Sequence, residues 1–404
     1  MAKLKGSLVV GQSGGPTTVI NSSLLGVIQE AMQHDCIQGI YGARWGIRGV
    51  LDEELIDLER EDDTVLEALL HTPSAALGTV RYKLKEQDYA RILEVFRAHN
   101  VRYFLYIGGN DSMNTAHRMH KLAEAGGYEL RAVGIPKTVD NDLAHTDHCP
   151  GYGSAARFVA MAVRDTGWDT ESMGSSAPVK IVEIMGRDAG WLTAAAALAK
   201  HEEEDAPHLV YVPERPVSVE QIGHDVVACM EKHGRAVIAL SEGARDETGE
   251  TIGAHAASVD VDAFGHRLKG GAVEYLSQVL RDIVGVKVRY DRPNYLQRSF
   301  ACAVSLVDRE EAYQAGRRGV RAAVEGHSNV MVALVREPGP EYRCTTALAP
   351  LGEIADVART LPDDFMNEAG NLPTERFLEY ARPLIGEPLT RYTRLKKVLI
   401  PKRT

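Results

Sequence analysis

Short apolar runs alternate with amphipathic stretches along most of the chain. The runs are rich in valine, isoleucine and leucine, as expected for buried strands, and the stretches between them repeat apolar residues at the spacing of one helix face. Strands that alternate with helices predict βαβ units, parallel sheets and an α/β fold. The predicted strand and helix pairs lie at 7–11 and 20–33, 101–109 and 112–125, 131–137 and 154–166, 179–185 and 190–201, and 208–214 and 219–233, followed by a strand at 235–243.

Polar residues gather where the predicted strands end. Gly, Lys, Arg, Asp or Glu stands at or just after the end of each of these strands. The carboxyl ends of the strands line the ligand crevice of an open parallel sheet, so a binding site is expected at that edge. Because no Gly/Ser-rich linker and no fixed-period repeat divides the chain, we expect domains that exchange strands rather than domains joined by a tether.

Composition narrows the classes of protein that fit. The 404 residues suffice for two or more domains with a substantial core. A formal net charge of −10 argues against a broad nucleic-acid-binding surface, although a local phosphate site needs only a few basic residues and backbone amides. No apolar run approaches the roughly 18 residues of a membrane helix, and the N-terminal stretch reaches glycine too soon for a signal peptide. Five scattered cysteines without a C-x-x-C pair are typical of a cytoplasmic protein.

The stretch "PKTVDND" (136–142) places one lysine and two aspartates directly after an apolar strand. Asp140 and Asp142 are two residues apart, so in an extended segment their side chains point the same way. Two such carboxylates repel each other unless Lys137 or a divalent cation supplies positive charge between them. The alternative is an Asx-rich turn that only ends a strand. The nearby "HTDHC" (145–149) lacks a second ligand pair at zinc spacing and is expected to be a flanking loop.

Three glycine turns add to this picture. "GQSGGP" (11–16) and "YIGGNDS" (106–112) each follow a predicted strand and precede a helix, where glycines admit a ligand and free helix amides favour an anion. Neither has the G-x-G-x-x-G or Walker A pattern, so neither predicts a standard dinucleotide or P-loop site. In "MGRDAGW" (185–191), Arg187 suits a phosphoryl oxygen or a sugar, unless it only pairs with Asp188. The first two turns and "PKTVDND" together predict a crevice for phosphate and metal.

Seven motifs occur in the order found in 6-phosphofructokinases and resemble in particular the pyrophosphate-dependent branch. They are "GQSGG", "LGTVR" (77–81), "GGND", "PKTVDND", "MGRDAG", "SEG" (241–243) and "NYLQR" (294–298), and the likeness runs from about residue 5 to about residue 325. The resemblance implies two Rossmann-like lobes with mainly parallel sheets and an active site in the cleft between them. We expect a phosphoryl-donor lobe at 1–150 completed by part of 299–345, a sugar-phosphate lobe at 151–298, and a helical C-terminal extension at 346–404.

The resemblance also implies roles for individual residues. Asp140 corresponds to the base that accepts the proton of the sugar 1-hydroxyl, and Thr138, Arg187 and Lys137 complete the catalytic group. The implied ligands of Mg²⁺ are Asp142 and Asn110. The implied donor-binding residues are Gly14, Gly15, Arg81, Gly109, Asp111 and Lys137, of which Arg81 joins Arg187 in stabilising the moving phosphoryl group. The implied substrate-binding residues are Thr138, Asp140, Met185, Gly186, Arg187, Glu242, Tyr295 and Arg298, with Arg289 reaching the substrate of a neighbouring subunit.

Lys137 and Asp111 indicate which phosphoryl donor is used. ATP-using relatives carry glycine at both positions. Pyrophosphate is compact and densely anionic and has no nucleoside to anchor it, so the extra point charge of Lys137 compensates for the missing contacts. The carboxylate of Asp111 adds bulk and repulsion where the inner phosphate of a nucleotide approaches the backbone.

Three positions depart from the family pattern. Asn110 stands where an aspartate usually helps to bind the metal, and its carbonyl oxygen can bind Mg²⁺ but contributes no charge. Tyr295 replaces the histidine of many ATP-using members, in keeping with the pyrophosphate branch. Pro178 lies at or near the place of a second cross-subunit arginine, so either another residue, such as Lys180, completes the 6-phosphate pocket or the interface differs.

The expected function is the Mg²⁺-dependent, reversible transfer of phosphate from pyrophosphate to the 1-hydroxyl of fructose 6-phosphate by a cytoplasmic homodimer or homotetramer with shared sites. The alternatives are ATP as donor, sedoheptulose 7-phosphate as acceptor, and a non-catalytic sugar-phosphate sensor, which has no need of a base at Asp140. A nicotinamide dehydrogenase is disfavoured because its dinucleotide fingerprint is missing. Neither nucleic acid nor a membrane is an expected partner.

Overall fold

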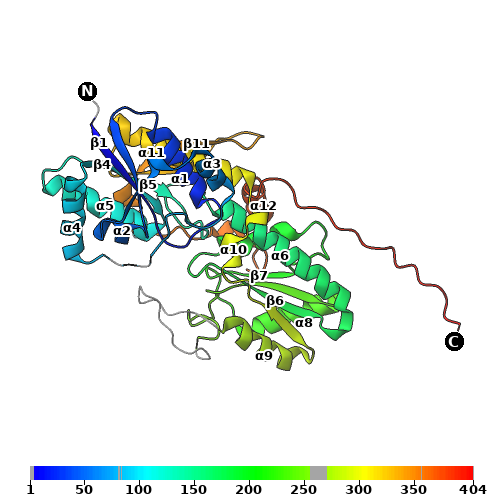
Figure 1. The fold of residues 1–404 in the computed structure, drawn as a ribbon. Helices are drawn as coiled ribbons and strands as arrows, with labels where there is room; N and C mark the ends of the chain where they lie inside the picture. The colour runs from blue at the N-terminus through cyan, green and yellow to red at the C-terminus, as the bar shows by residue number, and fades with distance from the viewer. Residues whose placement is uncertain (1–3, 81, 83, 255–270, 356, 404) are drawn as a thin grey trace.

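The computed structural model of the chain describes residues 4–80, 82, 84–254, 271–355 and 357–403. Within these ranges, Figure 1 shows two twisted sheets with helices around each. The large sheet has the order β11 (Cys344–Pro350), β10 (Val330–Arg336), β5 (Arg131–Pro136), β4 (Val101–Gly108), β1 (Gly6–Gln12), β2 (Ile37–Ala43) and β3 (Leu55–Asp57). Its inner strands are parallel, and β3 and β11 pair antiparallel at its two edges.

Helices bury both faces of the large sheet. One face carries α1 (Ile20–Ala31) and α11 (Leu306–Glu325), and the other carries α4 (Glu86–Ala98) and α5 (Asn110–Ala125). Successive side chains of β1 point to opposite faces of the sheet: Leu8 and Val10 face the α1 side, and Val9 faces the α4 side. Because helices bury both faces, every position of the strand is apolar in this stretch. Two short helices, α2 (Ile47–Leu51) and α3 (Asp63–Ala68), lie in the connections around β2 and β3.

The small sheet is parallel throughout. Its order is β7 (Leu209–Tyr211), β8 (Ala236–Ser241), β6 (Val179–Ile184) and β9 (Val288–Asp291). Val182 and Ile184 of β6 face the core beneath α6 (Tyr152–Met173) and α7 (Trp191–Ala194). Val179 and Ile181 of the same strand face the core shared with α8 (Val219–His233) and α9 (Ala272–Val284). The short α10 (Leu296–Ser299) follows β9.

The C-terminal extension is less helical than expected. Among the described residues after β11, the one α-helix is α12 (Glu375–Ala381), and short 3-10 turns and irregular segments make up the rest. Leu361, Phe377 and Leu384 nevertheless enter the core beneath α6, so the extension is packed onto the small sheet. Its final residues run away from the body as an extended arm whose apolar side chains, among them Leu395 and Ile400, are exposed (Figure 1).

The predicted α/β class and its parallel sheets are confirmed. All six predicted strands are present, and five predicted helices correspond to α1, α5, α6, α7 and α8. The helix expected at 190–201 is the least regular, because α7 gives way to a 3-10 helix at Ala195–Ala199. Two strands that the apolar pattern missed, β10 and β11, extend the large sheet beyond β5. No helix among the described residues has both the length and the apolar character needed to cross a membrane.

Candidate active site

The loops that follow β1, β4 and β5 lie against one another at the carboxyl edge of the large sheet. Lys137, the first residue after β5, donates its backbone N–H to the carbonyl of Gly108 at 3.0 Å. Its side chain, only 3% exposed, reaches the β1 loop and donates from Nζ to the carbonyl of Gly15 at 2.7 Å. One lysine therefore joins the three loops that the sequence predicted to form a phosphate crevice.

The glycines of these loops permit the close approach. Gly14 has a φ of +74°, a left-handed conformation that favours glycine. A Cβ atom on Gly14 would lie 3.2 Å from Nζ of Lys137, and one on Gly15 would lie 2.5 Å from Nη1 of Arg298. Gly109 has more room, since its Cβ would be 3.7 Å from the Lys137 carbonyl. Side chains on the first two glycines would thus displace the cations that face them.

Asp140 and Asp142 do not lie on an extended segment. The chain turns at Val139 and Asp140, and Asn141 between the aspartates has a φ of +55°. Asparagine tolerates this left-handed conformation better than most residues, and its side chain is held on both sides. Its Oδ1 accepts from the backbone of Cys149 at 2.9 Å, and its Nδ2 donates to the hydroxyl of Tyr380 at 2.9 Å.

Asp140 lies at the meeting point of the two lobes. Burial raises its pKa to about 7, and the carboxylates of Asp142 and Glu242 act in the same direction. Lys137 and Arg187 oppose this rise in the pKa of Asp140. Glu242 and Arg187 follow β8 and β6 of the small sheet, so charges at the carboxyl ends of both sheets act on the Asp140 carboxylate.

Lys137 is a cation in a costly position. Burial and the nearby charge of Arg298 lower its pKa to about 8, although Asp140 and Asp142 favour its charged form. Thr138, next in the chain, is also buried and accepts the backbone N–H of Asp140 at 3.2 Å through its hydroxyl. The segment from Lys137 to Asp142 therefore concentrates one buried ammonium and two carboxylates in the turn after β5.

Asn110 and Asp142 form an oxygen-rich pair that suits Mg²⁺. Nδ2 of Asn110 lies 3.5 Å from Oδ2 of Asp142, and Oδ1 of Asn110 is buried without a hydrogen-bond partner among the described residues. An orphaned carbonyl oxygen beside a carboxylate fits a hard cation that takes oxygen ligands. Burial raises the pKa of Asp142, while its own backbone N–H, Thr138 and Arg359 lower it. Asp111 is exposed in the first turn of α5.

The loops after β6 and β8 are interlocked. Gly186, with a φ of +130°, donates its N–H toward Oε1 of Glu242 at 3.4 Å. Its carbonyl accepts from the Ser241 hydroxyl at 2.6 Å, and the N–H of Met185 donates to Oε1 of Gln297 at 3.0 Å. Asp188 forms its ion pair with Arg245 at 3.3 Å. The alternative in which Arg187 only pairs with Asp188 is therefore not favoured.

The basic residues on and around β9 divide into two groups. Arg298 lies over the ring of Tyr295 at 4.4 Å from its centre and faces Gly15, which places it nearer to the donor loops than expected. Arg289 is instead held on α6, where it pairs with Asp169 at 2.9 Å. Lys180, the candidate replacement for a family arginine, is buried and pairs with Asp291 at 2.7 Å. Arg81 lies outside the described residues.

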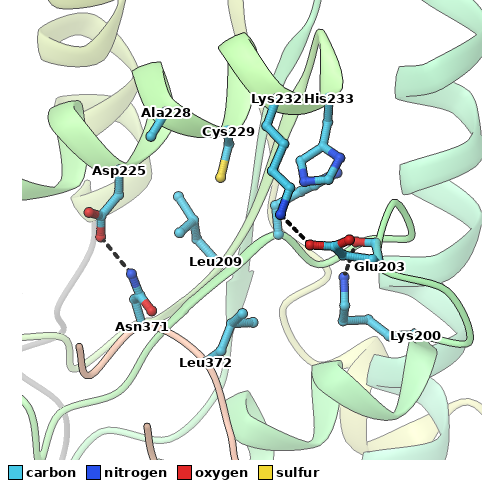
Figure 2. Close-up of a pocket in the computed structure, with 11 residues that line it drawn as sticks. Lys200, Glu203, Leu209, Asp225, Ala228, Cys229, Lys232, His233, Asn371 and Leu372 are labelled. Atoms are coloured by element: carbon cyan, nitrogen blue, oxygen red, sulfur yellow. Dashed lines mark hydrogen bonds and ion pairs between the residues drawn. The ribbon is translucent and has the colours of Figure 1, made fainter. Parts of the chain in front are cut away.

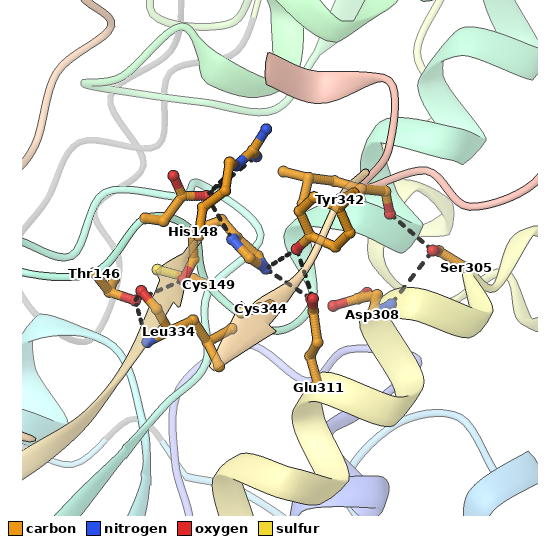
Figure 3. A network of polar contacts seen from close by, with 12 residues as sticks. Thr146, His148, Cys149, Ser305, Asp308, Glu311, Leu334, Tyr342 and Cys344 are labelled. Atoms are coloured by element: carbon orange, nitrogen blue, oxygen red, sulfur yellow. Dashed lines mark hydrogen bonds and ion pairs between the residues drawn. The ribbon is translucent and has the colours of Figure 1, made fainter. Parts of the chain in front are cut away.

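Two groups of contacts around the catalytic turn were not predicted. The first comes from the C-terminal extension, in which Arg359 and Tyr380 bind the carbonyl groups of the turn. The second is shown in Figure 3, where His148 lies between two carboxylates, with Nδ1 2.8 Å from Asp147 and Nε2 2.7 Å from Glu311. These hydrogen bonds outweigh burial and raise the pKa of His148 to about 9.

The His148 contacts explain why "HTDHC" is a flanking loop. His148, Glu311 and Cys344 offer ligand atoms within 4.8 Å of one another, which resembles a metal site. Both imidazole nitrogens are already engaged by carboxylates, and Tyr342 donates its hydroxyl to Glu311 at 2.5 Å. The group therefore acts as an ion-pair network that holds the loop against Glu311 of α11 and Arg336 of β10.

A separate cavity of about 290 Å³ lies beside α8 and β7 (Figure 2). Asn371 of the C-terminal extension bridges to Asp225 of α8 at 3.0 Å along one wall, and His208 is a further lining residue. None of the described residues expected to act in phosphoryl transfer lines this cavity. The candidate active site is therefore the region around Asp140.

Comparisons with known proteins agree with this geometry. A family model described as Phosphofructokinase matches residues 7–323. A protein of Xanthomonas campestris pv. campestris (strain B100), named pyrophosphate–fructose 6-phosphate 1-phosphotransferase, is 41% identical over 98% of this chain and 98% of its own length. The crystal structure of a pyrophosphate-dependent phosphofructokinase from Marinobacter aquaeolei has a TM-score of 0.86 and 37% identity, and covers 98% of both chains. With its motif loops gathered at Asp140 and with relatives matched along nearly its whole length, this chain belongs to the phosphofructokinase family.

Proposed function

We propose that this chain transfers a phosphoryl group from pyrophosphate to the 1-hydroxyl of fructose 6-phosphate, giving fructose 1,6-bisphosphate and phosphate. The observation that carries the proposal is the buried ammonium of Lys137, which joins the glycine loops of the large sheet beside Asp140. A point charge held there suits a compact, densely charged donor without a nucleoside. The names of the Xanthomonas and Marinobacter relatives support the same donor.

Asp140 acts as the general base. A carboxylate whose pKa lies near 7 accepts a proton more readily than an ordinary aspartate and remains largely ionised above that pH. The proton of the 1-hydroxyl passes to Asp140 as the sugar oxygen attacks phosphorus, and the bond from phosphorus to the bridging oxygen of pyrophosphate breaks. Arg187 and Lys137 supply positive charge to the moving phosphoryl group and to the departing phosphate.

Asn110 and Asp142 would hold Mg²⁺. The bound ion would neutralise charge on the pyrophosphate oxygens. The support is the unpartnered Oδ1 of Asn110 beside the Asp142 carboxylate. With one charged ligand in this pair instead of two, we expect weaker metal binding than at an Asp–Asp pair.

The sugar phosphate lies on the small-sheet side of Asp140. Met185, Gly186 and Glu242 would form this part of the pocket, since hydrogen bonds between backbone and side-chain atoms hold their loops in place. Tyr295 and Arg298 would close it from the segment after β9, with Arg298 between the sugar and the donor loops.

The proposed assembly is a homodimer or homotetramer with shared sites. Arg289 lies on β9, an edge strand of the small sheet, and its Nε is buried without a hydrogen-bond partner among the described residues. If the ion pair with Asp169 opens, the guanidinium would be available to a sugar phosphate bound by a neighbouring subunit. The five free cysteines suit a reducing compartment, so we propose that the enzyme acts in the cytoplasm.

The test compares donors at a fixed concentration of fructose 6-phosphate and Mg²⁺. Pyrophosphate should exceed ATP by at least about 10²-fold in kcat/KM, because Lys137 and Asp111 both act on donor choice. Equal rates with the two donors would refute the assignment of the donor, and binding of the sugar phosphate without turnover would indicate a sensor. Sedoheptulose 7-phosphate, run in parallel, tests the acceptor. The Asp111→Gly variant should gain activity with ATP relative to the wild type.

A further inference from the structure

Arg359 of the C-terminal extension binds the catalytic turn through its backbone carbonyls. Its guanidinium donates to the carbonyl of Asn141 at 2.9 Å from Nη2, and to those of Thr146 at 2.9 Å and Asp147 at 2.5 Å from Nη1. Its own backbone N–H donates to the carbonyl of Asp142 at 2.7 Å. The guanidinium of Arg359 thus binds carbonyls at both ends of the 141–147 segment, which directly follows Asp140.

The same arginine is fixed from the other side by the small lobe. Its guanidinium lies over the ring of Trp191, 4.3 Å from the ring centre, and its carbonyl accepts from Nε1 of Trp191 at 3.1 Å. Trp191 is only 2% exposed and begins α7, four residues after Arg187. Arg359 therefore connects the turn that carries Asp140 with the segment that carries Arg187.

Tyr380 of α12 reinforces this arrangement. Its hydroxyl accepts from Nδ2 of Asn141 at 2.9 Å and donates to the carbonyl of Asp147 at 2.8 Å. Its ring also packs on Trp191, with ring centres 5.4 Å apart. Arg359 and Tyr380 hold Asn141 by its backbone and its side chain respectively, so contacts from the extension, together with the Cys149 N–H, hold Asn141 in its left-handed conformation.

We propose that Arg359 is a positioning residue for phosphoryl transfer, which holds the Asp140 turn in register with the Arg187 loop. Arg359 does not touch the reacting atoms, and its contribution is the geometry of the residues that do. This inference rests on the proposed function. A planar guanidinium is required because it offers several donors in fixed directions, whereas the ammonium of lysine cannot reach the same carbonyls together.

The experiment compares Arg359→Ala and Arg359→Lys with Arg394→Ala, a matched control. Arg394 also belongs to the extension and forms several ion pairs, with Glu171, Glu204 and Asp205, but it makes no contact with the catalytic turn. Arg359→Ala should lose about 10²-fold in kcat with a change of less than threefold in KM for fructose 6-phosphate, because small displacements of reacting groups cost rate. Added guanidinium ion should raise the kcat of Arg359→Ala at least fivefold. The kcat of Arg394→Ala should stay within twofold of the wild-type value.

Hydrogen exchange of the 138–149 segment provides a reading independent of turnover. Exchange there should rise at least tenfold in Arg359→Ala and stay unchanged in Arg394→Ala. If Arg359→Ala does not fold, Arg359→Lys takes its place. The kcat of this variant should be lower than that of the wild type, by up to about tenfold. Unchanged kcat and exchange in a folded Arg359 variant would overturn the proposal. An inactive wild type would refute the proposed function instead, and the exchange result would still decide the role of Arg359.

Discussion

Replacement of Lys137 by methionine should make the protein more stable and the enzyme much slower. Methionine fills nearly the same space without a charge. At neutral pH the buried ammonium is disfavoured in the folded protein, because its pKa is about 8 there and 10.5 ordinarily. The difference of about 2.5 corresponds to about 3 kcal/mol at about 1.4 kcal/mol for each pKa unit. Loss of the hydrogen bond to Gly15 offsets about 1 kcal/mol of this gain, so the variant should be about 2 kcal/mol more stable at pH 7.

The gain in stability should depend on pH in a defined direction. The pKa of Lys137 is lower in the folded protein than in the unfolded chain. The buried charge therefore lowers the free energy of unfolding of the wild type at every pH at which lysine is ionised in the unfolded chain. That cost declines as the pH rises from about 8 to 10.5. Between pH 7 and pH 9.5, the advantage of the variant should therefore shrink by about 2 kcal/mol.

Activity should change in the opposite direction. Loss of a buried positive charge near the phosphoryl donor removes about 3 kcal/mol of transition-state stabilisation, or about 10²-fold in kcat/KM for pyrophosphate. Urea unfolding at the two pH values and steady-state kinetics measure the two effects. Lys200→Met is the control, because the pKa of Lys200 is also lowered to about 8 by burial but its side chain binds carbonyls beside the separate cavity. Unchanged pyrophosphate kinetics in Lys137→Met, or equal losses in both variants, would refute the reasoning.

The remaining predictions concern the base, the loop network and the subunit interface. Asp140→Asn should lower kcat at least about 10²-fold with little change in KM for fructose 6-phosphate, and near-normal turnover would return Asp140 to a structural role. In the wild type, kcat/KM should fall as the pH drops through about 7, where the free Asp140 carboxylate takes up a proton. His148→Gln should lower the free energy of unfolding by up to about 3 kcal/mol at pH 6, because the pKa of His148 is raised from 6.5 to about 9 in the folded protein. This loss should vanish as the pH rises through about 9, and a loss in urea unfolding that does not depend on pH would contradict the prediction. Mixing Arg289→Ala subunits with Asp140→Asn subunits should restore part of the activity if sites are shared, and no recovery despite proven subunit exchange would exclude sharing.

The parallel sheets and the positions of the phosphate loops could be predicted because local sequence carries them. A strand buried on both faces, such as β1, has an unbroken apolar sequence, and glycines mark the loops after β1, β4 and β6. The roles assigned to Asp140 and its neighbours remain predictions, which the substitutions above test.

Other features depend on contacts that sequence patterns do not record. The left-handed Asn141 is maintained by Tyr380, which is 239 positions later in the chain, and nothing near Asn141 signals that partner. The side chain of Arg298 faces Gly15 rather than only its neighbour Tyr295, because the two lobes bring distant loops together. An arginine such as Arg359, in a segment without a motif, gives no sign of its carbonyl partners before the fold is known.

The link between the Asp140 turn and the extension has a consequence for how the protein is made. Asn141 leaves the ribosome 218 residues ahead of Arg359, the partner that binds its carbonyl. At about 5–20 residues per second, the nascent turn waits roughly 10–40 s for that partner. The strands β10 and β11, which complete the large sheet, are also made late. During translation, a chain can therefore bury most of the β1, β4 and β5 core while its catalytic turn is still unsupported, so we expect transfer activity to begin only after Arg359 and Tyr380 have been made.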